Sequence, residues 1–476
     1  MEGMSLNMKK RSYIIYVILF VVICIFPLCS MSFYSNNESI EKRELHKKPL
    51  IKQYGKWNKN YFSQYTDYFN DNFGFRQDMA GLNACILRNV FFTSSEKNVV
   101  VGSNGWLYYS DTIDDYCGLN RMNKRQLHNC SRVLYLIQQY VQSKGAKFVF
   151  TIAPNKNTLY NENMPYYYRK GEEESDYDVL CKYLSDDNVN NVNLKYVFNN
   201  DDRVLYHKMD THWNNQGAAL AHKAILKSFG LEGIDFDKVH YYGIKNFTGD
   251  LYQMLYPNGN ARDVNIMYDY YFHYNYKGKK VTTDMMKFDS WNENAKGSLL
   301  MFRDSFGNAL TPFMSEEFAH CSFTKAVPYN LSVMETQPYD YVVIELAERH
   351  LKQLQESIPI VPAQETDYLP EYTMDSADNV KLNVDEKNNL GLVELYGYTD
   401  SDFTSESSNI YIQIVSEGKI YTFEAFPALN DVRENTQKRD YGYGIYIPQS
   451  IYKKGETKAI VITEKDGKMY AVEKRI

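Results

Sequence analysis

The feature that most constrains the fold of this chain is an alternation of apolar strands and amphipathic helices between residues 99 and 360. Strands are expected where β-branched and aromatic residues cluster, at 147–153, 203–209, 298–302 and 339–346. Helices are expected at 124–143, 214–229 and 309–318, and a hairpin at 100–109 that turns at 103–105. Such an alternation is typical of a parallel sheet with helices on its faces. The sequence therefore predicts an α/β domain at residues 61–360.

The segment at 373–476 has a different pattern of expected secondary structure, because short strands follow one another with no helical stretch between them. Turn signals such as Asp466-Gly467 separate strands expected at 391–398, 410–415, 420–426, 442–447, 458–463 and 469–473. This pattern predicts a small accessory β-sandwich, which resembles the carbohydrate-binding modules appended to some enzymes. The rings available to stack on a sugar are Tyr396, Tyr398, Phe403, Tyr411, Tyr441 and Tyr443, although core packing is the default role for most of them.

The N-terminal residues indicate a membrane anchor. A basic flank, Lys9 to Arg11, precedes an apolar run from Tyr13 to about Phe33 that is long enough to cross a bilayer as a helix. Because a basic flank stays in the cytoplasm, we expect a single-pass protein of the cell membrane whose later residues lie outside the cytoplasm. Residues 1–35 would be the cytoplasmic tail and transmembrane anchor, and 36–60 a polar tether. A cleaved signal peptide is the alternative, because the run contains Pro27 and small residues follow it.

Composition argues against several classes of protein. Hydrophobic residues make up 44% of the chain, which is too many for a disordered chain, and the formal net charge of -6 offers no basic surface for nucleic acid. Two of the seven cysteines fall in the expected anchor, and the five that remain include no C-x-x-C pair. We therefore expect buried free thiols rather than a disulfide scaffold.

Ser305 is a candidate nucleophile. It lies in SLLMFRDSFGNAL, just past an expected buried strand and just before a helix. In open α/β folds ligands bind at the carboxyl ends of the strands, and the free amides at the start of a helix can stabilise an oxyanion. An ordinary helix cap is the alternative role for this serine.

Asp210 and His212 supply the base that a serine nucleophile needs. Both lie in MDTHWNNQG, two residues apart on an expected strand-to-helix turn, so the carboxylate can orient the ring while Nε2 faces the serine. This turn and the Ser305 turn are both expected at carboxyl ends of strands in one sheet. The structural alternative is another capped helix start with Trp213 packed beneath it.

Metal chemistry is the competing interpretation of these side chains. His207, Asp210 and His212 could bind a cation, and His222 lies nearby in the sequence, but their spacing is not that of a known metal motif. The chain also contains no glycine-rich phosphate loop of either common type. We expect neither a metal nor a cofactor.

Three blocks of the sequence, MDTHWNNQGA, MFRDSFGNALTPFM and IAPNKNTLY, resemble the signatures of the alginate O-acetyltransferase family, whose catalytic domain is SGNH-hydrolase-like. Their order is similar too, since the Asp-x-His-Trp motif precedes the serine. The blocks YFNDNFGFR, VVGSNGWLYY and GDLYQML extend the resemblance to about residues 61–351.

The resemblance implies that Ser305 accepts the acyl group, that His212 is the general base and that Asp210 orients it. It also implies transfer of acetyl to an exported polysaccharide, with a membrane-bound O-acyltransferase as the partner that donates the acyl group. Arg303 departs from the pattern, because hydrolases of this class usually carry glycine two residues before the serine. This arginine is either a surface residue or one that faces a charged substrate.

Six further residues are weaker candidates for contacts with the oxyanion or with a sugar hydroxyl. They are Asn155, Lys156, Tyr160, Trp213, Arg303 and Asn308.

Two other functions stay open at this stage. If water reaches the acyl-serine, the same three residues make a carbohydrate acetylesterase. If the three residues serve only as helix caps, the chain is a non-catalytic protein that binds glycan or scaffolds an assembly.

Overall fold

The computed structural model describes residues 2–31, 46–53, 55–91, 93–368, 370–374, 380–386, 391–399, 401–429 and 440–476. Residues 36–45 of the expected tether therefore lie outside the described part of the chain. The part of the tether that is described contains a two-stranded hairpin, β1 (Lys52–Gln53) and β2 (Lys56–Trp57).

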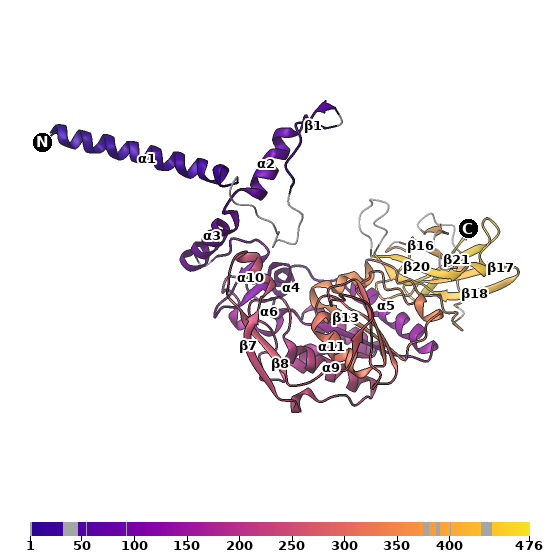
Figure 1. The fold of residues 1–476 in the computed structure, drawn as a ribbon. Coiled ribbons are helices and arrows are strands. Elements are labelled where there is room, and N and C mark those ends of the chain that lie inside the picture. The colour runs from indigo at the N-terminus through magenta and orange to yellow at the C-terminus, as the bar shows by residue number, and fades with distance from the viewer. Residues whose placement is uncertain are drawn as a thin grey trace.

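A mixed sheet lies at the centre of the molecule, around the strand labelled β13 in Figure 1. It has seven strands in the order β6-β5-β13-β11-β12-β10-β9. The first five strands are parallel and the last two run antiparallel to their neighbours. The strands are β5 (Lys147–Ala153), β6 (Asn191–Val192), β9 (Asn275–Tyr276), β10 (Lys287–Trp291), β11 (Ser298–Phe302), β12 (His320–Thr324) and β13 (Tyr341–Ala347). The predicted α/β class is confirmed, although β9 and β10 add an antiparallel edge that was not predicted.

Both faces of this sheet are buried. Leu299 and Met301 of β11 pack into a core on one face, whereas Leu300 and Phe302 pack into a second core on the other face. This alternation explains why the strands read as continuous apolar runs. The helices that cover the first face are α8 (Leu194–Asn199), α9 (Asn215–Phe229) and α11 (Gly307–Glu317), and those on the second are α5 (Lys124–Ser143) and α7 (Asp176–Asp186).

The expected strand at 203–209 is wrong. This segment makes only an isolated bridge between Tyr206 and Trp213 and does not join the sheet. The chain folds back on itself instead, because the amide of Asn214 donates to the carbonyl of Leu205 at 2.8 Å and that of His207 donates to His212 at 3.2 Å. The Asp210 turn therefore lies in a closed loop and not at the end of a sheet strand.

Shorter elements surround the sheet. They are β3 (Val99–Val101), β4 (Leu107–Tyr109), α4 (Ile113–Cys117), α6 (Lys156–Leu159), β7 (Tyr241–Phe247), α10 (Asp250–Leu255), β8 (Asp263–Tyr268) and a 3-10 helix, η5 (Glu348–Gln355). Of these, β3 and β4 pair as the expected hairpin, with Asn104 and Gly105 at positive φ in the turn.

The C-terminal residues form two further sheets with a shared apolar core, as expected for a sandwich. One has the order β14-β22-β21-β17-β18 and the other β15-β16-β20-β19. Their strands are β14 (Thr373–Met374), β15 (Lys381–Asp385), β16 (Leu392–Tyr398), β17 (Tyr411–Ser416), β18 (Lys419–Glu424), β19 (Phe426–Ala428), β20 (Gly442–Pro448), β21 (Lys458–Lys465) and β22 (Lys468–Arg475). Tyr443, one of the candidate stacking rings, is buried in this core.

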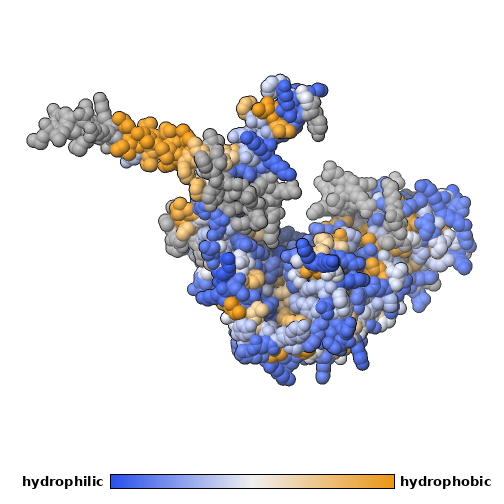
Figure 2. Space-filling view, in the orientation of Figure 1, coloured by the Kyte–Doolittle hydropathy of each residue, from blue (hydrophilic) through white to orange (hydrophobic). Residues whose placement is uncertain are grey.

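The N-terminal helices are α1 (Glu2–Ser30), α2 (Tyr61–Asn72) and α3 (Arg76–Phe91), and α1 projects away from the sheet (Figure 1). The side chains from Tyr13 to Phe26 are exposed and form the apolar band along α1 in Figure 2. Within the part of the chain that the structure describes, no helix combines the length and apolarity needed to cross a membrane, so the expected span is not confirmed.

The sandwich packs against α5 through buried polar contacts. Arg125 donates to the carbonyl of Ser408 at 2.6 Å, and Arg132 pairs with Glu424 of β18. The side chains of Arg132 and Glu424 are 15% and 11% exposed, so the pair is largely shielded from water. We expect it to contribute more than a surface ion pair does.

Replacing Arg132 with alanine should lower the free energy of unfolding by about 1–3 kcal/mol, because Glu424 would keep its charge without a partner. The thermal midpoint of the purified protein is the measurement. Lys144→Ala is the matched control, since Lys144 caps the end of the same helix and its pair with Glu335 is more exposed, so its loss should cost about 0–1 kcal/mol. Equal losses in the two variants would contradict a structural role for the Arg132 pair.

Candidate active site

Ser305 lies in the turn between β11 and α11, at the carboxyl edge of the central sheet. The preceding residue, Asp304, fixes this turn because its carboxylate accepts hydrogen bonds from the amides of Phe306 and Ala347, each at 2.8 Å. Ala347 is the last residue of β13, so the serine turn is tied to the neighbouring strand. Ser305 itself is half-buried and can be reached from solvent.

A buried acid lies beneath the serine turn. Glu345 of β13 is buried and accepts a hydrogen bond from the amide of Asp304 at 3.1 Å. Burial and the negative charge of Asp304 raise the pKa of Glu345 well above its usual value. Burial would also raise the pKa of Asp304, but His350 and the positive charge of Arg349 outweigh it and hold that pKa low. Of this pair, Glu345 therefore has the raised pKa and Asp304 the lowered one.

Arg303 and Asn308 bind each other on either side of Ser305. Nη1 of Arg303 donates to Oδ1 of Asn308 at 2.5 Å, while Nη2 donates to the carbonyls of Thr283 and Met285. A Cβ atom on Gly307 would lie 2.6 Å from Cδ of Arg303, which explains the glycine at this position. Arg303 is buried, so of its two expected roles the surface role does not fit.

The loop that carries Asp210 and His212 is held from below by Lys156. Its buried ammonium donates to the carbonyls of His207 and Lys208, each at 3.1 Å, and to that of Asp210. Burial lowers the pKa of this ammonium to about 8, although nearby carboxylates oppose the shift. Lys156 thus supports the backbone of the loop.

Tyr160 and Asn214 fix the two ends of the same loop. The Tyr160 hydroxyl accepts from the amide of Leu205 at 2.8 Å. The Asn214 side chain caps α9 by accepting from the amides of Gln216 and Gly217, and it donates to Val204.

The structure brings Ser305, His212 and Asp210 together. Oγ of Ser305 lies 2.8 Å from Nε2 of His212, and Nδ1 of the same ring lies 2.8 Å from Oδ1 of Asp210. The His212 side chain is 24% exposed and that of Asp210 is 6% exposed, so only the serine end of this chain of hydrogen bonds faces solvent. The distances are those of a serine activated by an oriented histidine.

Asp210 and His212 shift each other's pKa. Burial would raise the pKa of Asp210, but the hydrogen bonds from the His212 ring and from backbone amides hold it well below its usual range. Burial would lower the pKa of His212, but the hydrogen bond and charge of Asp210, together with Asp250, raise it above the usual 6.5. The imidazole therefore takes up a proton more readily than a free histidine does.

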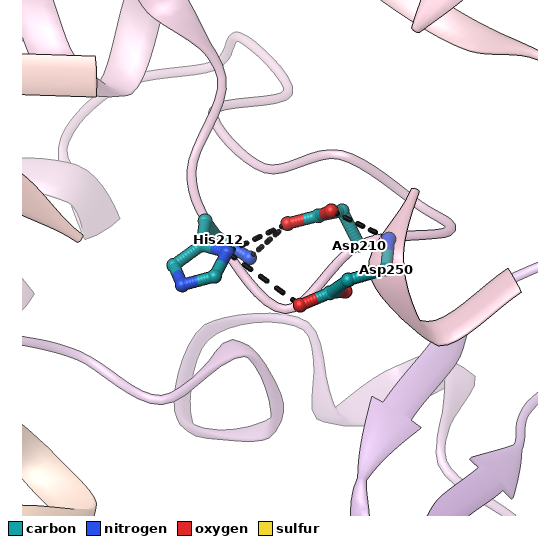
Figure 3. Close-up of side chains that lie close together, drawn as sticks. All are labelled: Asp210, His212 and Asp250. Carbon is teal, nitrogen blue, oxygen red and sulfur yellow. Dashed lines mark hydrogen bonds and ion pairs between the residues drawn. The ribbon is translucent and has the colours of Figure 1, made fainter. Parts of the chain in front are cut away.

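Asp250 was not predicted as a site residue, although it lies in the GDLYQML block that resembles the family. Its carboxylate is 3.8 Å from Nδ1 of His212, and its backbone amide donates to Oδ2 of Asp210 at 2.7 Å (Figure 3). Burial and the charge of Asp210 raise the pKa of Asp250. Figure 3 shows both carboxylates on the same side of the imidazole.

The same three residues offer a possible set of cation ligands. One ligand atom each from Asp210, His212 and Asp250 lies within 4.8 Å of the others. A cation would compete with the hydrogen bond between Asp210 and Nδ1 of His212. His207 is not in this group, and its ring stacks on Phe247 with centroids 3.8 Å apart.

Trp213 and Asn155, two of the weaker candidates from the sequence, are both buried. Trp213 is 1% exposed and contacts the edge of the Phe306 ring, with centroids 5.0 Å apart. Asn155 follows β5, and its backbone amide donates to the carboxylate of Glu348 at 2.7 Å. The side-chain atoms of Asn155 have no hydrogen-bond partner among the residues the structure describes.

Comparisons with known proteins agree with the resemblance in the sequence. Residues 99–283 match the family model described as an SGNH hydrolase-like domain of the acetyltransferase AlgX, so the predicted resemblance is confirmed over this segment. A search of curated proteins finds no match.

Several solved structures are similar to parts of the chain. PatB1 of Bacillus cereus, with a sulfonyl adduct, is 16% identical, with 53% of this chain and 95% of that one covered and a TM-score of 0.44. The O-acetyltransferase domain of Pseudomonas putida AlgJ is 17% identical, with 54% and 92% covered and a TM-score of 0.37. Pseudomonas aeruginosa AlgX is 11% identical, with 78% and 94% covered and a TM-score of 0.34.

Replacing Asp210 with asparagine should lower the pKa of His212, because the variant removes the charge and the strong acceptor that raise it. An NMR titration of the His212 ring measures this pKa without any assumption about function. Asp250→Asn is the matched control and should lower the pKa by less, since its carboxylate is farther from Nδ1. An unchanged His212 pKa in Asp210→Asn would contradict the coupling.

Proposed function

We propose that this protein is an O-acetyltransferase that moves an acetyl group to hydroxyls of a polysaccharide through an acyl intermediate on Ser305. The observation that carries the proposal is the continuous hydrogen-bonded chain from Oγ of Ser305 through His212 to Asp210. The match of residues 99–283 to an acetyltransferase domain supports the proposal that the transferred group is an acetyl group.

In the first half of the reaction, Nε2 of His212 removes the hydroxyl proton as Oγ of Ser305 attacks the acyl carbonyl carbon. A bond forms between Oγ and this carbon, and the carbonyl π electrons move onto the oxygen. Asp210 stabilises the imidazolium through Nδ1, which explains the need for a carboxylate that stays ionised. The tetrahedral adduct collapses when the leaving oxygen takes the proton from Nε2, and an acyl-serine remains.

The second half repeats these steps with an acceptor hydroxyl in place of the serine hydroxyl. His212 removes the acceptor proton, the acceptor oxygen attacks the acyl carbon, and Oγ of Ser305 leaves with the proton. Because His212 must be neutral to begin each half, activity should fall as the pH drops through its raised pKa, that is, from somewhat above 6.5 downward.

The acceptor, the donor partner and the location are the more distant parts of the proposal. We infer a polysaccharide acceptor outside the cytoplasm, and a membrane-bound O-acyltransferase that supplies the acetyl group. The exposed apolar side chains from Tyr13 to Phe26 on a projecting helix support a location at the membrane (Figure 2).

Hydrolysis is the second candidate reaction. Ser305 and His212 are both partly exposed, so water has access to the atoms that an acceptor hydroxyl would approach. An acetylesterase would use the same residues and the same first half-reaction.

Ser305→Ala should reduce release of p-nitrophenolate from p-nitrophenyl acetate by about 10³-fold or more, because no other group replaces the nucleophile. Mass spectrometry of the rapidly quenched wild-type protein should show one acetyl group on the peptide with Ser305. Ser298→Ala, at the other end of β11, is the matched control and should keep the wild-type rate. Full activity in Ser305→Ala would remove the serine from the reaction.

An oligosaccharide acceptor should divert acetyl from water to sugar hydroxyls in the wild-type protein. The products to measure are acetylated oligosaccharide, by mass, and free acetate. If acetate remains the sole product over a series of neutral and acidic oligosaccharides, the esterase assignment replaces the transferase.

A further inference from the structure

Arg349 lies at the carboxyl edge of the sheet, past the end of β13, which neighbours the strand that leads to Ser305. It lies two residues past the end of β13, and β13 is hydrogen-bonded along its length to β11, with Phe302 opposite Ile344. The two strands end side by side, and the bond from the amide of Ala347 to Asp304 locks the Arg349 segment to the serine turn. Nothing in the sequence around Arg349 indicates that it is a site residue.

The Arg349 guanidinium packs against two aromatic rings at this edge. Its central carbon is 5.5 Å from the centroid of Phe306, the residue after Ser305, and 5.8 Å from that of Tyr109. The Phe306 ring in turn contacts the His212 ring, with centroids 4.9 Å apart. The cation is therefore held over an apolar surface next to the serine and the imidazole.

The charge of Arg349 acts on both sides of Ser305. It helps to hold down the pKa of Asp304, which precedes the serine, and it opposes the rise in the pKa of His212. The acids that face the imidazole at Nδ1 are Asp210 and Asp250. The His212 ring, which contacts Ser305 through Nε2, is thus under the opposing charges of Arg349 and of these two carboxylates.

One donor nitrogen of Arg349 is unused. Nη1 is buried and has no hydrogen-bond partner among the residues that the structure describes. A buried donor without a partner is destabilising, so such groups call for an explanation. Arg303 differs at its Nη atoms, which both bind oxygen atoms of the protein, so that only its Nε has no partner among the described residues.

We propose that Arg349 is a catalytic residue whose Nη1 donates a hydrogen bond to the oxyanion of the tetrahedral adduct on Ser305. In the attack step the carbonyl π electrons become a full negative charge on this oxygen, and they return to the C–O bond when the adduct collapses. A charged donor that is fixed before the reaction stabilises this oxygen without a cost for reorganisation. This role presupposes acyl transfer through Ser305.

Arg349→Met tests this role because methionine keeps the apolar packing and removes the charge and the donor. With the neutral ester p-nitrophenyl acetate, the rate constant of the acylation burst should fall by about 10²–10³-fold while KM changes by less than about twofold. The pH at which the rate falls on the acid side should rise, since the positive charge that opposes protonation of His212 is lost.

Arg349→Lys keeps a positive charge and guards against a folding defect in the methionine variant. It should recover part of the lost rate, because a single ammonium replaces the planar fork imperfectly. Lys352→Met is the matched control: it removes a cation from the same η5 helix, where Nζ binds the carbonyl of Asn120, and should leave the burst unchanged.

A wild-type acylation rate in both Arg349 variants would overturn the proposal. So would a defect that appears only as a raised KM for acidic oligosaccharides, because the arginine would then bind the acceptor. Ser305→Ala separates this failure from failure of the proposed function. If the serine variant is inactive and the Arg349 variants are normal, acyl transfer through Ser305 stands and only the oxyanion role falls.

Discussion

The buried carboxylate of Asp210 is the constraint on which the arrangement of the site depends. A charge in this position is stable only if the chain around it supplies donors, and three come from the His212 ring, the His212 amide and the Asp250 amide. Lys156 adds a positive charge behind the loop by binding its carbonyl groups. Satisfying this one carboxylate thus sets the path of the loop, the tautomer of the imidazole and the direction in which Nε2 points.

The serine turn is organised by a second acid, the partly buried Asp304, which is bound by backbone amides. Asp304 accepts amide hydrogen bonds from the residue after the serine and from the end of β13, while burial and the charge of Asp304 raise the pKa of Glu345 beneath it. The serine is therefore presented by the sheet, whereas the histidine is presented by a loop that only contacts the sheet. The 2.8 Å bond between Oγ and Nε2 joins these two units.

Much of the fold could be predicted because the strongest local signals were also the ones that tertiary packing follows. The predicted bounds of β5, β11 and α5 coincide with the observed ones, since continuous apolar runs and a helix stopped by Gly145 leave few alternatives. The strand expected at residues 203–209 is absent because Leu205 and Tyr206 are buried but pair with the returning chain, which no periodicity in the sequence reveals.

The site, like the fold, could be predicted where the signal is local. The turns that carry Asp210, His212 and Ser305 can be recognised in the sequence. Arg349 comes near the site only through strand register, and Asp250 only through contacts between loops.

The loop from Leu205 to Asn214 closes on itself through its own backbone bonds and the Tyr206–Trp213 bridge. Its path is also held from outside, by the Lys156 ammonium and by the amide of Asp250, which donates to Asp210. Because the acid and the base lie on one closed loop, a displacement of the loop moves both groups together, and the contact between Nε2 of His212 and Oγ of Ser305 is the one that has to absorb it.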